Sequence, residues 1–347
     1  MNPEKTLKED FISERSSNLD IEKLITKRKN ERFAYLLGMF TQILWAFNGV
    51  QIKTCRRYFP DSYSDNSVLF WRMFIVALIG YIICKYKKVH IQSFSELKNL
   101  NWFLLRNATA YVFIMCWIKM FSYFRVSTIS VVGSIAPLII ILLSVFLINE
   151  KFYFRYLIGV LLCIVSSAII ISNDKNPSSK SQILNDNVFV GILFAICNIG
   201  LYSLSAVGQK VLTKEGMEIN LQNYYFGLYN SVPALVMYIF SGEIFSLNIK
   251  YCLYVCTNGL NFYVANYLTT ICLKYIAVSK FQLITYLVIV FTFILSAILL
   301  GEPIFFTDIF GAGVIIGFQY YNFIHPPGRT VNENVSKEQF LNRQNNS

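Results

Sequence analysis

The sequence carries little charge for its length. Of its 347 residues, only 15% are Asp, Glu, Lys or Arg, whereas 55% are hydrophobic and 16% are aromatic. Soluble domains usually carry about 25% charged residues, so this composition excludes an ordinary soluble protein. The hydrophobic residues gather in runs of about 20, the length that crosses a bilayer as a helix. The sequence therefore predicts a polytopic membrane protein whose first partner is the lipid bilayer.

Signatures of catalysis and of metal binding are also missing. The sequence has no G-x-S-x-G, H-E-x-x-H or Walker A motif, and its eight cysteines include no Cys-x-x-Cys pair. We therefore expect no enzymatic activity, no cofactor and no metal site. The net charge of +11 comes from residues that flank the apolar runs rather than from one basic stripe, so we expect no nucleic-acid partner.

The apolar runs predict an all-α protein with ten transmembrane helices. These lie at about 33–53, 67–84, 102–123, 127–148, 153–172, 188–210, 221–241, 250–273, 279–300 and 304–323. Polar composition predicts disordered cytosolic tails at 1–32 and 324–347 and a linker at 173–187, which contains Pro177. Residues 1–32 lack the pattern of a cleaved signal peptide, so we expect the first span to be retained.

The chain repeats itself once. Glu150 and Glu302 lie 152 residues apart, and the same offset aligns the segment from Val126 to Ser172 with the segment from Val278 onward. The two repeats, 33–172 and 188–323, would each hold five spans. Because five is odd, the second repeat must enter the membrane from the opposite side. Inverted repeats of this kind are typical of secondary transporters, in which two halves expose a central site alternately to each side.

Lysine and arginine in the short loops indicate the orientation. Fifteen of them fall on the side that holds both termini and eight on the other side. Because positive loops stay in the cytoplasm, we expect both termini to be cytoplasmic. The sequence gives no address for a particular membrane, and the plasma membrane, Golgi and endoplasmic reticulum all stay open.

Several short motifs recur at ordered positions along the chain. They are Trp45, Phe70-Trp71-Arg72, Leu105-Arg106, Pro137, Glu150 and Gly301-Glu302-Pro303. This set resembles the drug/metabolite transporter superfamily with paired EamA-type domains. The resemblance covers about 33–323, its C-terminal part is most similar to the G branch of solute carrier family 35, and it implies a ten-helix transporter. Tyr229-Asn230 resembles part of a nucleotide-sugar carrier motif, but Ser231 follows where a second Asn is expected.

The ionisable residues within the predicted spans are basic rather than acidic. No acidic residue falls in the middle of a predicted span, whereas Arg72, Arg106 and Lys280 reach into them. Charge at membrane depth is costly and usually functional, and arginine grips carboxylates and phosphates. An anionic or polar solute is therefore favoured over a cation. The alternative is that these side chains extend to the membrane surface.

Neutral polar residues add further candidates. Ser130, Ser134 and Pro137 share one face of the fourth span, and Gln282, Thr285 and Tyr286 share the matching face of the ninth. These faces either line a central path or serve helix packing. The complete set of candidate solute-binding residues is Trp45, Asn48, Arg72, Arg106, Ser130, Ser134, Tyr202, Tyr229, Asn230, Asn258, Asn261, Lys280, Gln282, Thr285 and Tyr286.

Two glutamates and a set of glycines are interpreted as structural. Glu150 and Glu302 directly precede predicted helices, where a carboxylate caps free N–H groups. Gly311, Gly313 and Gly317 give the tenth span a close-packing face that could serve a homodimer.

The function predicted from the sequence is secondary transport of a small organic solute, anionic or polar, by alternating access. A second hypothesis is a transport-inactive membrane protein that binds or regulates a membrane partner. A third is an exporter of amino acids or drugs.

Overall fold

The structure is a computed structural model, and helices and their connecting turns make up the residues that it describes. These are 3–91, 96–97, 99–124, 126–133, 135–150, scattered positions between 154 and 165, 187–241, 248–301 and 306–324. The helices are α1 (Pro3–Tyr58), α2 (Asp65–Tyr86), α3 (Leu100–Tyr123), α4 (Val126–Gly133), α5 (Ala136–Ile148), α8 (Asn187–Lys214), α9 (Ile219–Phe240), α10 (Ile249–Tyr275), α11 (Val278–Thr285), α12 (Leu287–Leu300) and α13 (Phe306–Ile324).

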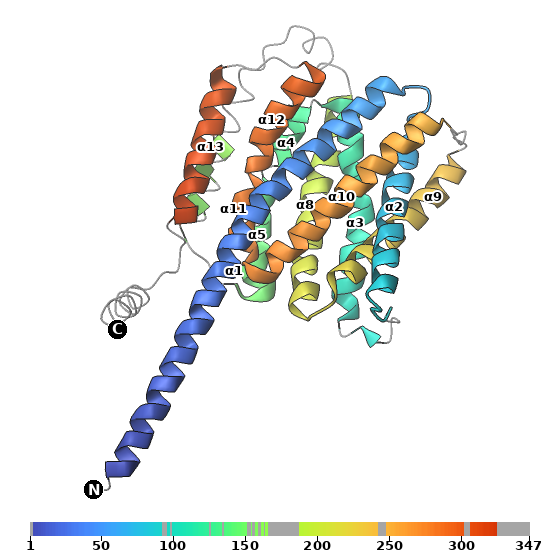
Figure 1. Cartoon of the computed structure of the whole chain (residues 1–347). Coiled ribbons are helices and arrows are strands. Elements are labelled where there is room, and N and C mark those ends of the chain that lie inside the picture. The colour runs from blue at the N-terminus through green and yellow to red at the C-terminus, as the bar shows by residue number, and fades with distance from the viewer. Residues whose placement is uncertain are drawn as a thin grey trace.

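The helices cross the molecule in alternating directions, as Figure 1 shows. We call the end at which α1 enters the bundle the terminal face, and the end at which α1 meets α2 the opposite face. Four segments are long and apolar enough to span a membrane by composition alone: Lys29–Tyr58, Asp65–Tyr86, Phe189–Lys214 and Val278–Leu300. Helices α3, α9 and α10 also have the length of a span, but they carry many of the buried polar side chains.

The fourth and ninth spans, expected as single helices, are each broken in two. α4 and α5 form the fourth span, and α11 and α12 form the ninth. Pro137 lies in the first turn of α5 and cannot donate a backbone hydrogen bond to the preceding turn. In the ninth span the Thr285 hydroxyl instead bonds the carbonyl of Gln282 at 2.7 Å, and such bonds compete with the helix ladder.

Both repeats end their broken span in the same way. α5 ends at Asn149 with a φ of 51°, and α12 ends at Gly301 with a φ of 70°. These left-handed residues lie 152 positions apart, the offset of the sequence repeat. Left-handed residues are the common termini of helices. The break that the sequence predicts after the fourth span is therefore present in both repeats.

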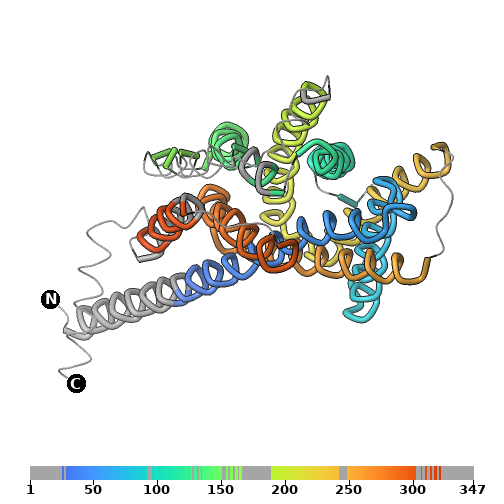
Figure 2. Tube along the Cα trace, turned by 90° about the horizontal axis from the view of Figure 1, so that it is seen from above, coloured from blue at the N-terminus to red at the C-terminus, as the bar shows by residue number. Residues whose placement is uncertain are grey.

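The helices of the two repeats interleave as an inverted repeat requires. α1 packs on α10, and its counterpart α8 packs on α3. α5 packs on α8, and its counterpart α12 packs on α1. Seen from above, α2 and α9 lie together at the end of the bundle away from α13 (Figure 2). The inverted repeat predicted from the sequence is confirmed.

Some expectations differ from the structure or lie outside it. Residues 3–32, expected as a disordered tail, belong to α1, and their Lys, Glu and Leu residues favour helix formation. The linker at 173–186, the tail from 325 onward, Ser134 and Glu302 lie outside the described residues, as does most of the fifth span at 153–172.

The α2–α9 contact depends on glycine. A Cβ added to Gly227 would lie 2.8 Å from the Cα of Ala77 and 2.8 Å from the Met73 oxygen. A Cβ added to Gly80 would lie 2.8 Å from the Cα of Tyr224. Both contacts are with backbone atoms, which cannot rotate away. The absence of these side chains lets α2 and α9 approach along their whole length.

We predict that Gly227→Ala destabilises the protein by about 1–3 kcal/mol, because overpacking a close helix contact costs about that amount. The measurement is the midpoint of thermal unfolding in detergent. Gly200→Ala on α8 is the control, since nothing lies within 4 Å of its added Cβ. Alanine there should leave the midpoint unchanged or raise it. Equal midpoints for both variants would contradict the proposed close contact.

Candidate solute-binding site

Arg72 lies in the interior of the bundle. It is on α2, is only 1% exposed, and its guanidinium carbon lies 4.1 Å from the ring centre of Phe262 and 5.3 Å from that of Trp117. Its Nε and Nη1 have no hydrogen-bond partner. The sequence left open whether this side chain extends to the membrane surface. Its burial shows that it does not.

Arg106 on α3 is buried to the same extent. It is 1% exposed, and its Nη1 donates to Oε1 of Gln222 on α9 at 3.0 Å. Its guanidinium carbon lies 5.2 Å from the ring centre of Phe226. Nε and Nη2 have no partner. Among the described residues, no carboxylate forms a salt bridge with Arg106 or Arg72.

Aromatic rings replace the missing carboxylates only in part. A guanidinium over an aromatic ring gains about 0.5–2 kcal/mol, whereas burial of an unpaired charge costs several kcal/mol. The contacts with Phe262, Trp117 and Phe226 therefore leave both arginines under-compensated. Free N–H donors on a buried cation are suited to bind an anion, because hydrogen bonds to charged groups are stronger than neutral ones.

An amide cluster joins α1 to α10. Asn258 donates from Nδ2 to Oδ1 of Asn48 at 3.2 Å and to Oε1 of Gln51 at 3.2 Å. Asn261 donates to the carbonyl of Leu44 at 3.0 Å. These amides bond across the helix interface, because polar groups inside a membrane must find their hydrogen-bond partners within the protein. Nδ2 of Asn48 and Oδ1 of Asn258 keep no partner, so both residues retain capacity for a solute.

A second polar cluster lies between α8, α9 and α10. Gln209 donates to Thr270 at 2.6 Å, and Asn266 donates to Asn223 at 2.6 Å. The cluster also includes Gln222, whose amide nitrogen donates to Thr213 at 3.3 Å. Sequence reasoning missed Gln222 and Asn223 as site residues because they lie in the first turns of a span, where a polar side chain usually faces water. The polar run Asn220–Asn223 was the available signal.

The candidate residues of the fourth and ninth spans differ in what their side chains contact. Ser130 donates to the carbonyl of Val126 at 3.0 Å, and Thr285 bonds within its own helix, so both serve the local backbone. Gln282 is 2% exposed and its Oε1 has no partner, whereas Tyr286 is 1% exposed in the apolar core. Among the described members of this set, Gln282 is the residue with a free polar atom.

The remaining candidates take peripheral or packing positions. Trp45 donates from its indole nitrogen to Thr269 at 3.2 Å and contacts Phe262 edge-on. Tyr202 packs edge-on against Phe113 of α3. Tyr229 packs against Phe103. Asn230 donates to the Phe226 carbonyl at 2.5 Å, one turn earlier on α9, while its Oδ1 has no partner.

Contacts between the repeats close the terminal face. Glu150 accepts hydrogen bonds from the backbone N–H of Val278 at 3.0 Å and of Ser279 at 3.3 Å. The sequence interpretation expected Glu150 to cap the helix that follows it. The structure shows it bonded to the start of α11 in the other repeat, and the start of the fifth span lies outside the described residues. Lys280 of the second repeat pairs with Glu31 on α1 at 3.6 Å. Within the second repeat, Lys210 donates to the carbonyls of Leu273 and Ile276 at the same face.

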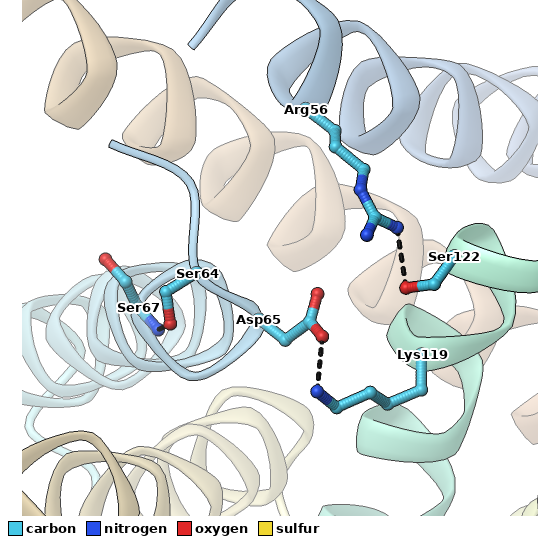
Figure 3. Close-up of polar contacts among 6 residues, drawn as sticks. All are labelled: Arg56, Ser64, Asp65, Ser67, Lys119 and Ser122. Carbon is cyan, nitrogen blue, oxygen red and sulfur yellow. Dashed lines mark hydrogen bonds and ion pairs between the residues drawn. The ribbon is translucent and has the colours of Figure 1, made fainter. Parts of the chain in front are cut away.

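Contacts at the opposite face are of another kind (Figure 3). Lys119 on α3 pairs with Asp65 at the start of α2 at 2.7 Å, and Arg56 on α1 donates to Ser122 at 2.6 Å. Tyr63 lies beneath the Arg56 guanidinium, and burial together with the Asp65 charge raises the pKa of its phenol. All of these residues belong to the first repeat. They brace α1, α2 and α3 against one another.

The fold and the buried polar groups define an integral, multi-pass membrane protein built from two inverted helical repeats. The EamA-like transporter family matches residues 32–172 and 189–321, so the chain belongs to the EamA-like transporter family. No curated protein matches the sequence. One crystal structure, described only as that of a protein, aligns with a TM-score of 0.68 at 14% identity, over 82% of this chain and 96% of the other.

We predict that Glu150→Ala opens the terminal face. Without the carboxylate, α11 loses a cap worth about 1 kcal/mol. Cys272 on α10, whose thiol donates to the Ala34 carbonyl and is 0% exposed, should then react faster with a membrane-impermeant maleimide. The measurement uses a variant that retains only Cys272 of the eight cysteines.

Glu215→Ala is the matched control, because Glu215 is a carboxylate near the same face that bonds Asn99 rather than α11. Its loss should leave labelling unchanged. Equal labelling rates for Glu150→Ala and the parent would show that the Glu150 contact does not hold this face closed.

Proposed function

We propose that the protein is a secondary transporter of a small organic anion and works by alternating access. Membership of a transporter family supports the class. The observation that supports an anionic solute is the burial of Arg72 and Arg106. Each is 1% exposed and has guanidinium nitrogens without a hydrogen-bond partner. A polar neutral solute stays within the proposal, because buried amide atoms also remain free.

The charge distribution argues against a proton-coupled exporter of cationic drugs. Such an exporter needs a buried carboxylate that alternates between a proton and the cation. In the described helices the carboxylates with known partners lie at helix ends, as Asp65 and Glu150 do, or on the part of α1 before its predicted span, as Glu31 does. Exchange or facilitated diffusion therefore fits the chain better than proton coupling through a buried acid.

The proposed binding set follows from free polar atoms. It keeps Arg72, Arg106, Asn48, Asn230, Asn258 and Gln282, each of which is buried and has an atom without a partner. Trp45 and Asn261 support this set through α10. Ser130, Thr285, Tyr202, Tyr229 and Lys280 have local or peripheral contacts, so we assign them supporting roles.

Orientation, branch and assembly are part of the proposal. The excess of Lys and Arg at the terminal face supports cytoplasmic termini. Membership of the G branch of solute carrier family 35 rests on the motif resemblance alone. On α13, added Cβ atoms at Gly313 and Gly317 would meet nothing within 4 Å, which leaves that face open to a second copy.

We predict counterflow of an organic anion in liposomes that contain the purified protein. The panel offers carboxylates, sugar phosphates, nucleotide sugars and amino acids, each as a preloaded solute. Arg106→Gln should abolish counterflow of the transported anion, whereas Arg106→Lys, which keeps the charge, should retain part of it. Lys274→Gln is the control, since Lys274 is exposed at the end of α10.

The outcomes separate the alternatives. Counterflow of cations but not anions would overturn the charge argument and favour an exporter. No counterflow, together with no change in thermal stability on addition of any solute, would favour a transport-inactive protein that regulates a membrane partner.

A further inference from the structure

Resting on the proposed anion transport, we infer that the path contains two anion subsites in series. One is centred on Arg72 toward the opposite face, and the other on Arg106 toward the terminal face. The stacked rings of Phe262 and Phe226 separate them. A transported anion binds first to one guanidinium group and then to the other, and it does not bridge both at once.

The two arginines lie in different halves of the helical bundle. α2 begins at the opposite face and Arg72 is two turns from that start, about 10 Å inside. α3 begins at the terminal face and Arg106 is almost two turns from its start, about 9 Å inside. Figure 1 shows α2 and α3 crossing the same bundle. The two side chains therefore enter the interior from opposite ends.

A chain of aromatic contacts connects the two guanidinium groups. Arg72 lies over Phe262 at 4.1 Å, Phe262 stacks on Phe226 at 5.9 Å with an interplanar angle of 20°, and Phe226 lies 5.2 Å from Arg106. Both rings are buried, at 4% and 3% exposure. Each guanidinium thus has a ring of its own, and in the proposed arrangement this ring pair divides one subsite from the other.

Each subsite has polar groups of its own. At the terminal end, Gln222 on α9 accepts from Arg106, and its amide nitrogen donates to Thr213 on α8. At the other end, Gly259 brings α10 against the backbone of Arg72, because an added Cβ would lie 2.9 Å from the Arg72 oxygen. The neighbouring Asn258 carries a free Oδ1. The two sets share no residue.

This arrangement specifies the class of substrate. The favoured solute is compact and presents one carboxylate or phosphate group to one guanidinium at a time. A long molecule with two charged ends would instead need both arginines at once. The free donors, Nε and Nη1 of Arg72 and Nε and Nη2 of Arg106, allow each guanidinium to offer two N–H groups to that anionic group.

The test measures transport separately from each face. Proteoliposomes sorted for one orientation receive a panel of compact anions, namely inorganic phosphate, phosphoenolpyruvate and succinate, at either face. For the anion that the parent carries, Arg72→Gln should raise KM about tenfold to a hundredfold from the opposite face and leave KM from the terminal face nearly unchanged. Arg106→Gln should show the reverse pattern.

Arg72→Lys and Arg106→Lys keep the charge and should recover part of the affinity at their own face. Lys274→Gln removes an exposed cation outside both subsites and should change neither KM. The thermal midpoint of each variant identifies a folding defect, and the lysine variants then carry the test.

A rise of KM at both faces in both variants would overturn the two-subsite arrangement in favour of one bridged site. Unchanged KM in both variants would overturn it as well. Absence of any anion transport by the parent protein would instead contradict the proposed function, so the two failures are distinguishable.

Discussion

Two guanidinium groups buried without a carboxylate partner among the described residues are the constraint around which the interior is arranged. Arg72 and Arg106 reach the interior from opposite ends, and each lies against an aromatic ring. A hydrophobic side chain at either position would pack with less penalty. The burial of these charges therefore costs free energy that a bound anion can offset. The free N–H donors of the two guanidinium groups are available to bind it. This connects packing directly to the proposed selectivity.

The repeat explains how such a site can face two sides. Because the second repeat is inverted, α1 pairs with α10 as α8 pairs with α3. The helices that carry the arginines, α2 and α3, pair with α9 and α8 of the other repeat. Each guanidinium therefore lies at an interface between repeats, where a rocking motion changes its surroundings. Close glycine contacts between α2 and α9 hold these backbones together while the broken fourth and ninth spans offer places to bend.

Much of the fold could be predicted from the sequence, because hydrophobic length and the offset of 152 residues are visible there. The sequence suggested that Arg72 and Arg106 could be buried, but it did not show where in the bundle their side chains lie. Two differences between the sequence interpretation and the structure have physical causes. Ser130 and Thr285 were candidates because hydroxyls share a helix face, but a hydroxyl can bond its own helix. Gln222 was missed because it is near a span end in the sequence, whereas packing of α9 on α3 buries it to 1% exposure.

The polar contacts at the two faces have different consequences for motion. At the opposite face, Asp65–Lys119 and Arg56–Ser122 join helices of one repeat, so these contacts can persist while the repeats move. At the terminal face, Glu150 bonds α11 and Lys280 pairs with Glu31, and both contacts cross between repeats. Opening the terminal face must therefore break them. Because a single carboxylate holds two backbone N–H groups of α11, its loss frees the start of the ninth span, the helix that continues to Gln282 in the interior. Movement at the terminal face is thus coupled to the wall of the proposed path.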